Sequence, residues 1–158
     1  MTEPPAPIER TAEGDFRVQL GPEERDLLRR LTAELEELLA AEPGDPSLRR
    51  LRPRAYEDEH VEREYRSLIG SELESLRLEN LRGLAETADR DRLDPGELDR
   101  WLAALNDLRL VLGTRLDVRE DEFADGFYPH APHAYELAVY AFLTWLQEAA
   151  IQAAAQSL

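Results

Sequence analysis

The stretch "LNDLRLVLGTRL", residues 105–116, decides the fold of this chain. Its leucines recur every three or four residues, the spacing that gathers apolar side chains on one face of an α-helix. At about 100° per residue, one apolar arc of roughly 80° holds the side chains of Leu98, Trp101, Leu105, Leu108, Leu112 and Leu116. A helix with such a face must bury it against other elements, so the stretch predicts a bundle of packed helices.

The start of this helix is also marked in the sequence. In "LDPGEL", Asp94 suits the N-cap, Pro95 suits the first helical position, and Glu97 stands three residues after the cap. These signals predict a helix that begins at Pro95 and runs to about Leu116.

Three further helices are predicted by the same criteria, from Pro22 to about Ala41, from about Glu57 to Ala88, and from Ala131 or His133 to Gln156. In "IERTAEGDFRVQL", residues 8–20, apolar side chains alternate after the turn residues "EGD", which predicts a short hairpin. The expected fold class is therefore mainly α, a bundle of about four long helices with a small N-terminal β-hairpin.

The domain organisation follows from this pattern. Residues 1–7 are rich in proline and are expected to be frayed, while residues 8–158 form a single helical domain. The acidic connection 117–133 is long for a compact domain, and whether it is a binding segment stays open.

Composition excludes several classes of chemistry. The chain has 158 residues, no cysteine and a formal net charge of −15, and all nineteen basic residues are arginines. Without cysteine or lysine there is no thiolate nucleophile, no cysteine-bound zinc and no Schiff base. The negative charge argues against nucleic acid and anionic membranes as partners. The basic stretch "SLRRLRPR", residues 47–54, is interpreted as a solvated connection.

No apolar run is long enough to cross a membrane, and the first ten residues lack the features of a signal peptide. We therefore expect a cytoplasmic protein.

Arg109 stands beside the apolar arc of its helix, where a charge needs a partner. On the preceding helix, Glu72 and Glu79 fall within the arc that is defined by the apolar side chains of Val61, Tyr65, Leu68 and Leu76. The spacing predicts an ion pair between Arg109 and Glu72 or Glu79 that links the two helices. The alternative is that Arg109 binds an anionic ligand in a pocket between helices.

The last helix is apolar on nearly every side. Its second apolar stripe consists of Leu137, Tyr140, Thr144 and Ile151. A helix of this kind is shared with another chain or is central in the bundle. We predict a homodimer that forms through this stripe, and the alternatives are a helix central in a monomer or a site for another protein. Trp101 and Trp145 are expected to anchor the core.

Metal and catalytic motifs are incomplete. The candidate metal ligands are Glu57, His60 and Glu64 on one helix face, and His130, His133 and Glu136 around a proline. Only one E-x-x-H copy occurs, and neither group matches a zinc or di-iron pattern. No nucleophile motif or phosphate loop is present, so we predict no catalytic residues, no metal site and no cofactor.

Two stretches resemble the domain of unknown function 2017 family (DUF2017) of actinobacteria: "WLAALNDLRLVLGTRLDV" (101–118) and "YAFLTWLQEAAIQAA" (140–154). "LGPEERDLLRRLTAELEELL" and the strand pair before it fit the family as well. The resemblance implies an intracellular helical protein, often encoded beside the adaptor of the Clp protease. Some members are described as transcriptional regulators, and no catalytic residues are established for the family.

Three functions remain open from the sequence. The leading hypothesis is a non-enzymatic protein-interaction or accessory protein, linked by gene context to Clp-type proteolysis. The first alternative is a transcriptional regulator, and the second is a small-molecule or metal-binding enzyme.

Overall fold

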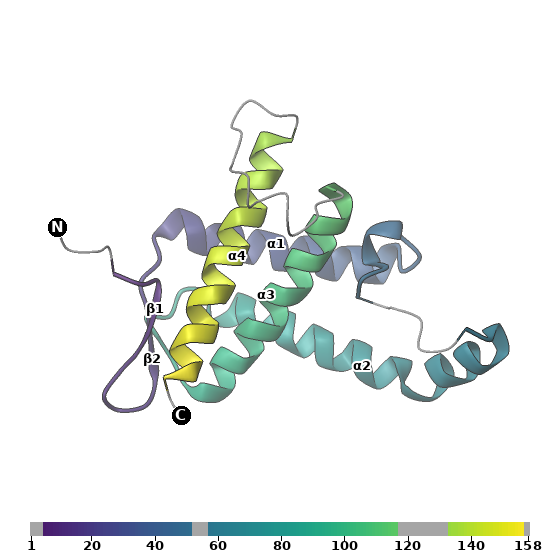
Figure 1. Cartoon of the computed structure of the whole chain (residues 1–158), viewed down its shortest axis with the longest axis horizontal. Helices are drawn as coiled ribbons and strands as arrows, with labels where there is room; N and C mark the ends of the chain where they lie inside the picture. The colour runs from purple at the N-terminus through teal and green to yellow at the C-terminus, as the bar shows by residue number, and fades with distance from the viewer. Residues whose placement is uncertain (1–4, 52–56, 117–132, 157–158) are drawn as a thin grey trace.

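The structure, a computed structural model, describes residues 5–51, 57–116 and 133–156. Helices dominate it, as the sequence predicted (Figure 1). The elements are β1 (Ile8–Arg10), β2 (Phe16–Val18), α1 (Pro22–Ala41), the short 3₁₀ helix η1 (Pro46–Leu48), α2 (Glu59–Thr87), β3 (Arg92–Leu93), α3 (Pro95–Leu116) and α4 (Ala134–Ala155). The predicted bounds of α1 and α3 are confirmed, and those of α2 and α4 shift by at most three residues.

The start of α3 has the predicted capping geometry. The Glu97 amide donates to the Asp94 carboxylate at 2.7 Å, and the Asp94 amide donates to the Glu97 carboxylate at 2.9 Å. This reciprocal pair satisfies two backbone donors that the helix itself leaves without acceptors.

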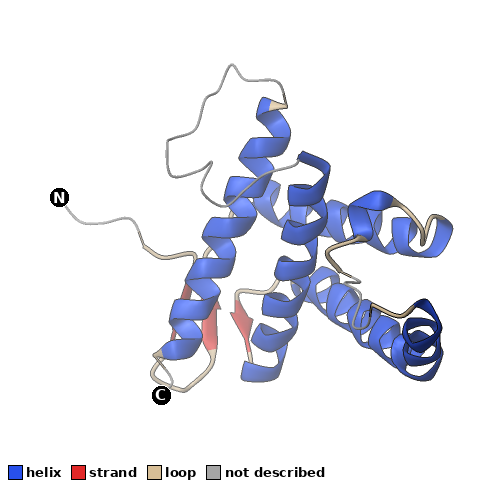
Figure 2. Cartoon of the chain, turned by 45° about the vertical axis from the view of Figure 1, so that its right-hand side comes forward, coloured by secondary structure: helices blue, strands red, loops and turns tan. Residues whose placement is uncertain are grey.

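The hairpin belongs to a three-stranded antiparallel sheet with the order β1-β2-β3. Its turn contains Gly14, whose φ of +91° suits a residue without a Cβ. Strand β3, which pairs Leu93 with Phe16, was not predicted, because two residues are too few to show an alternating pattern. Figure 2 shows the three strands together at the end of the bundle where α3 begins and α4 ends.

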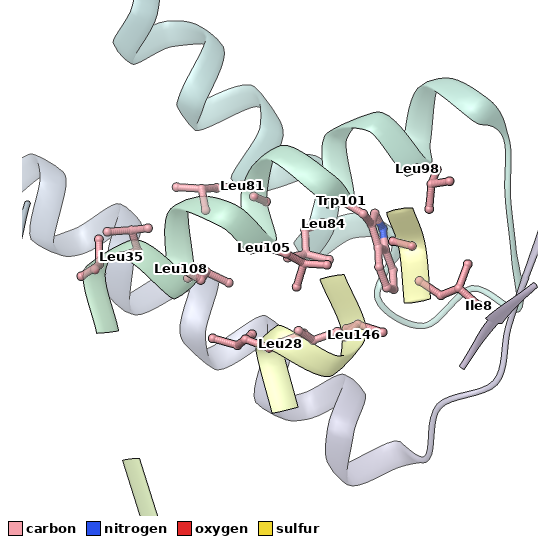
Figure 3. Close-up of a cluster of buried hydrophobic side chains, with 14 of the residues drawn as sticks. Ile8, Leu28, Leu35, Leu81, Leu84, Leu98, Trp101, Leu105, Leu108 and Leu146 are labelled. Carbon is pink, nitrogen blue, oxygen red and sulfur yellow. The ribbon is translucent and has the colours of Figure 1, made fainter. Parts of the chain in front are cut away.

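The core lies around α3, which packs on α1, α2 and α4. The side chains of Trp101, Ala104 and Leu105 are fully buried on this helix. Figure 3 shows Leu81 and Leu84 of α2, Leu28 of α1 and Leu146 of α4 among the side chains that surround them. Helix α3, which contains residues 105–116, is therefore the helix against which the other helices of the described chain pack.

Most buried side chains of α2 lie toward its C-terminal end, and Glu62 is a buried residue near its start. Leu81 and Leu84 are fully buried, whereas Val61, Leu68 and Leu76 are 39, 77 and 54% exposed. The prediction that these three residues form a core face is wrong. The N-terminal half of α2 extends past α3 and α4 (Figure 1), so no helix of the described chain covers that face.

Candidate functional site

Arg109 lies between α3 and α4. Its Nε donates to the Thr144 hydroxyl at 3.0 Å, and its Nη1 donates to the Gln147 side-chain oxygen at 3.4 Å. Its guanidinium carbon is 5.5 Å from the centre of the Tyr140 ring, within the range of a cation–π contact. A Cβ at Gly113 would lie 3.0 Å from that ring, so this glycine permits the close approach of α3 and α4.

The predicted pairing of Arg109 with α2 needs correction. Glu72 and Glu79 are exposed on α2, and the contacts of Arg109 with described residues run to α4. A helical wheel places Arg109 on the flank of the apolar arc but does not show which helix occupies that flank. In the structure α4 occupies that flank, and it contributes the Thr144 hydroxyl, the Gln147 amide and the Tyr140 ring to the contacts of Arg109.

An ion pair between α2 and α3 does exist, with different residues. Arg77 of α2 lies 3.3 Å from the Asp107 carboxylate of α3 and 2.8 Å from the Glu74 carboxylate. Its Nη2 also donates to the Leu51 carbonyl at 3.1 Å. Arg77 and Asp107 are each 15% exposed at the side chain, so the pair is largely shielded from solvent. The arginine that links these helices is therefore on α2 and the acid on α3.

The environment of Asp107 changes its titration. Burial raises the pKa of this carboxyl above its ordinary 3.8, while the Arg77 guanidinium opposes part of that change. The Asp107 carboxylate is therefore protonated at a higher pH in the folded protein than in the unfolded chain. In the charged form, Asp107 lowers the stability of the fold relative to a neutral group.

This gives a pH-dependent prediction. As the pH falls from neutrality through the raised pKa toward 3.8, the wild type should gain stability relative to the Asp107→Asn variant. The physical reason is that Asp107 is protonated at a higher pH in the folded protein than in the unfolded chain. Protonation removes the cost of burying its negative charge. The measurement is urea unfolding of both proteins at a series of pH values. A difference in the free energy of unfolding that does not vary with pH would contradict the raised pKa.

Two charged residues of the described chain are buried, Glu62 of α2 and Arg25 of α1, and the sequence pattern predicted neither. Arg25 makes the more extensive contacts among the described residues. Its side chain donates to four backbone carbonyls, those of Leu20 (3.0 Å), Ala88 (3.0 Å), Arg90 (2.8 Å) and Val18 (3.4 Å). It also forms a 3.1 Å ion pair with Asp91. Arg25 thus joins the start of α1 to β2 and to the turn after α2. One signal was present, because Arg25 stands three residues before the buried Leu28, on the same helix face.

The predicted self-association stripe on α4 is not one free surface. Tyr140 is 6% exposed and, with Thr144, faces Arg109 of α3, whereas Leu137 is half-buried and Ile151 is 51% exposed. The prediction of a single apolar face is therefore wrong, because packing on α3 uses half of it. Homodimerisation itself stays a prediction.

The exposed aromatic side chains of α4 lie elsewhere. Tyr135 is 63% exposed and Trp145 is 48% exposed, so the prediction that Trp145 anchors the core is wrong, while that for the fully buried Trp101 is confirmed. Trp145 contacts Phe142 and lines a groove of about 500 Å³ between α4 and residues 5–10.

The candidate metal ligands do not come together. His60 contacts Glu64 at 3.1 Å, but both side chains are exposed. His133 and Glu136 are on the first turn of α4 or just before it, and His130 lies outside the described residues. Within the described ranges, no group of three or more potential ligands could hold a metal ion.

The basic stretch is only partly described. Arg49 and Arg50 are exposed, while Arg52 and Arg54 lie outside the described residues. Among the helices of residues 5–51, 57–116 and 133–156, none combines the length and apolar content needed to cross a membrane.

Comparison with known proteins gives consistent matches to a family and to individual relatives. A family model described as "Domain of unknown function (DUF2017)" matches residues 5–154. The oxidative stress regulator AosR of Mycobacterium bovis and that of Mycobacterium tuberculosis are each 31% identical to this chain over an alignment of 175 residues. That alignment covers 84% of this chain and 79% of each relative. No solved structure matches the chain significantly.

Proposed function

Because the chain belongs to the DUF2017 family, as residues 101–118 and 140–154 predicted, and is homologous to the mycobacterial regulators, we propose that it is a non-enzymatic regulatory protein. The observation that carries this proposal is the extent of the match, which covers 84% of this chain and 79% of the relative. It therefore includes most of the helical domain of this chain. It favours the regulator alternative over an accessory role in Clp-type proteolysis and over an enzyme.

The mode of action that we propose is contact with another protein, such as a component of the transcription machinery. Direct DNA binding requires free cationic groups that neutralise phosphates. Here the net charge is −15. Many arginines of the described chain already contact carboxylates, namely Arg25, Arg29, Arg66, Arg77, Arg82, Arg90 and Arg92.

The relatives are named for the response to oxidative stress, but this chain has few side chains that an oxidant could modify reversibly. The sequence has no cysteine, and its one methionine is residue 1. Reversible oxidation of a protein by peroxide proceeds mainly on thiolates and methionine sulfur. We infer that an oxidant signal reaches this protein through a partner rather than through its own side chains.

The test of the regulatory role is a deletion of the gene in its native host. After a peroxide pulse, the transcript profile should differ between the deletion strain and the parent, and the wild-type gene should restore it. A transcript profile that is unchanged by the deletion, with and without peroxide, would reject the regulatory function.

The mode of action has its own test. The purified protein should not retard promoter fragments from the affected genes, even at a salt concentration of about 50 mM, where phosphate contacts are strongest. The adjacent and exposed Arg49 and Arg50 favour DNA binding instead. If the protein retards specific fragments and the Arg49→Glu, Arg50→Glu double variant does not, the protein acts by binding DNA and not by contact with another protein.

A further inference from the structure

Helix α2 has an exposed apolar face between residues 61 and 79. Val61, Leu68 and Leu76 lie within about 80° of arc, at a rotation of 100° per residue, on the side of the helix opposite Leu81 and Leu84. They are 39, 77 and 54% exposed. At a rise of about 1.5 Å per residue the three side chains form a ridge of roughly 22 Å. Hereafter this ridge is called the α2 outer face.

Exposed leucines that occur singly need no explanation, but these apolar side chains recur along one side of α2. Leu73, 50% exposed, widens it on one side. The N-terminal part of the helix that carries the face extends past α3 and α4, where a partner has access to it (Figure 1). A long apolar ridge on an exposed helix is the surface type that other amphipathic helices recognise.

Charges on this face specify the partner. Glu72 and Glu79 lie on the same line as the apolar side chains and are exposed, with no ion pair to other described residues. Over residues 57–79 there are eight carboxylates and three arginines, a net charge of −5. Two of these arginines, Arg66 and Arg77, already contact carboxylates of the chain. The face therefore offers apolar contacts and unneutralised negative charge together.

We propose that the α2 outer face binds an amphipathic helix of a partner protein that carries arginine or lysine beside its apolar residues. The proposal rests on the proposed regulatory function, for which it names the docking surface. The leucines of the partner would cover Leu68 and Leu76, and its cations would contact Glu72 and Glu79. A second copy of this chain fits poorly, because it would bring two segments of charge −5 together.

The test uses a fluorescently labelled synthetic peptide of about 20 residues, long enough to form a helix on binding. It has leucine at the a and d positions of each heptad and arginine at e and g, and a matched peptide has glutamate in place of arginine. Binding to the purified full chain is measured by fluorescence anisotropy. The arginine peptide should bind, and the glutamate peptide should not.

Variants locate the binding. The Glu72→Gln, Glu79→Gln double variant and the Leu68→Ala, Leu76→Ala double variant should each weaken binding by about tenfold or more, since each removes part of the face. Matched controls are Glu23→Gln, Glu37→Gln on α1 and Ile151→Ala on α4, all at exposed positions. The controls should leave the affinity within about twofold, which is a small change in binding free energy. All of these residues are exposed, so the unfolding midpoints should stay close to the wild type.

Three outcomes would overturn the proposal: absence of binding, equal losses in the carboxylate variant and its α1 control, or a dimer that the Leu68→Ala, Leu76→Ala variant dissolves. The second would mean unspecific attraction to an acidic protein, and the third would mean that a second copy occupies the face. If the peptide fails to bind while deletion of the gene changes the transcripts, the surface is wrong and the regulatory function stands.

Discussion

Replacement of Arg25 by methionine is expected to lower the free energy of unfolding by about 3–5 kcal/mol. Methionine keeps much of the apolar stem but cannot donate to the carbonyls of Leu20, Ala88 and Arg90, and buried acceptors without donors are costly. The loss should be measured by urea unfolding, followed by circular dichroism. The dependence of stability on urea should keep its slope, because the surface exposed on unfolding hardly changes.

Two further variants separate the geometry of Arg25 from its charge. Arg25→Lys keeps the charge but lacks the planar fork that reaches several carbonyls, so it should lose much of the same stability. Arg82→Met removes an exposed ion pair with Glu36 and should cost about 0–1 kcal/mol. If Arg25→Met were as stable as Arg82→Met, the buried hydrogen bonds would not hold the sheet and α1 together as described.

Trp101→Ala is expected to lower the free energy of unfolding by about 3–5 kcal/mol as well. The side chain is fully buried, and its Nε1 donates to the Thr87 hydroxyl at 2.6 Å, which in turn donates to the Gly83 carbonyl at 2.6 Å. Figure 3 shows Trp101 near Leu84 and Leu98 in the core. The substitution therefore leaves a cavity and removes a hydrogen bond between α3 and α2.

Trp145→Ala is the matched control for this prediction. Trp145 is 48% exposed on α4, so its loss should cost about 1 kcal/mol or less. In the Trp145→Ala protein the remaining tryptophan fluorescence comes from Trp101, and its emission maximum should lie at a shorter wavelength until the protein unfolds. Equal destabilisation by both substitutions would contradict the difference in burial.

Local patterns were sufficient for the helices. The bounds of α3 follow from Asp94, Pro95 and Glu97 together with the leucine spacing, because capping and amphipathicity depend on neighbours in the sequence. The pairing of β1 with β2 follows for the same reason. Strand β3 could not be predicted, since its two residues are defined only by the partner strand.

The partners of the charged residues could not be predicted from local sequence patterns. Arg109 and Asp107 are two residues apart on α3, yet the first contacts α4 and the second contacts Arg77 of α2. Periodicity shows which residues share a face but not which helix lies opposite. The role of Arg25 could not be predicted either, because its acceptors are mostly backbone carbonyls, which every residue has.

The sequence by itself determined four helices, a hairpin, the absence of cysteine and lysine side-chain chemistry, and membership of a family. Only the tertiary structure decided which charges are paired. It also decided that the apolar face of α2 is exposed, whereas Tyr140 and Thr144 of the α4 stripe contact α3. The physical reason is distance: helix formation depends on residues three or four positions apart, whereas burial and ion pairing depend on residues that only folding brings into contact.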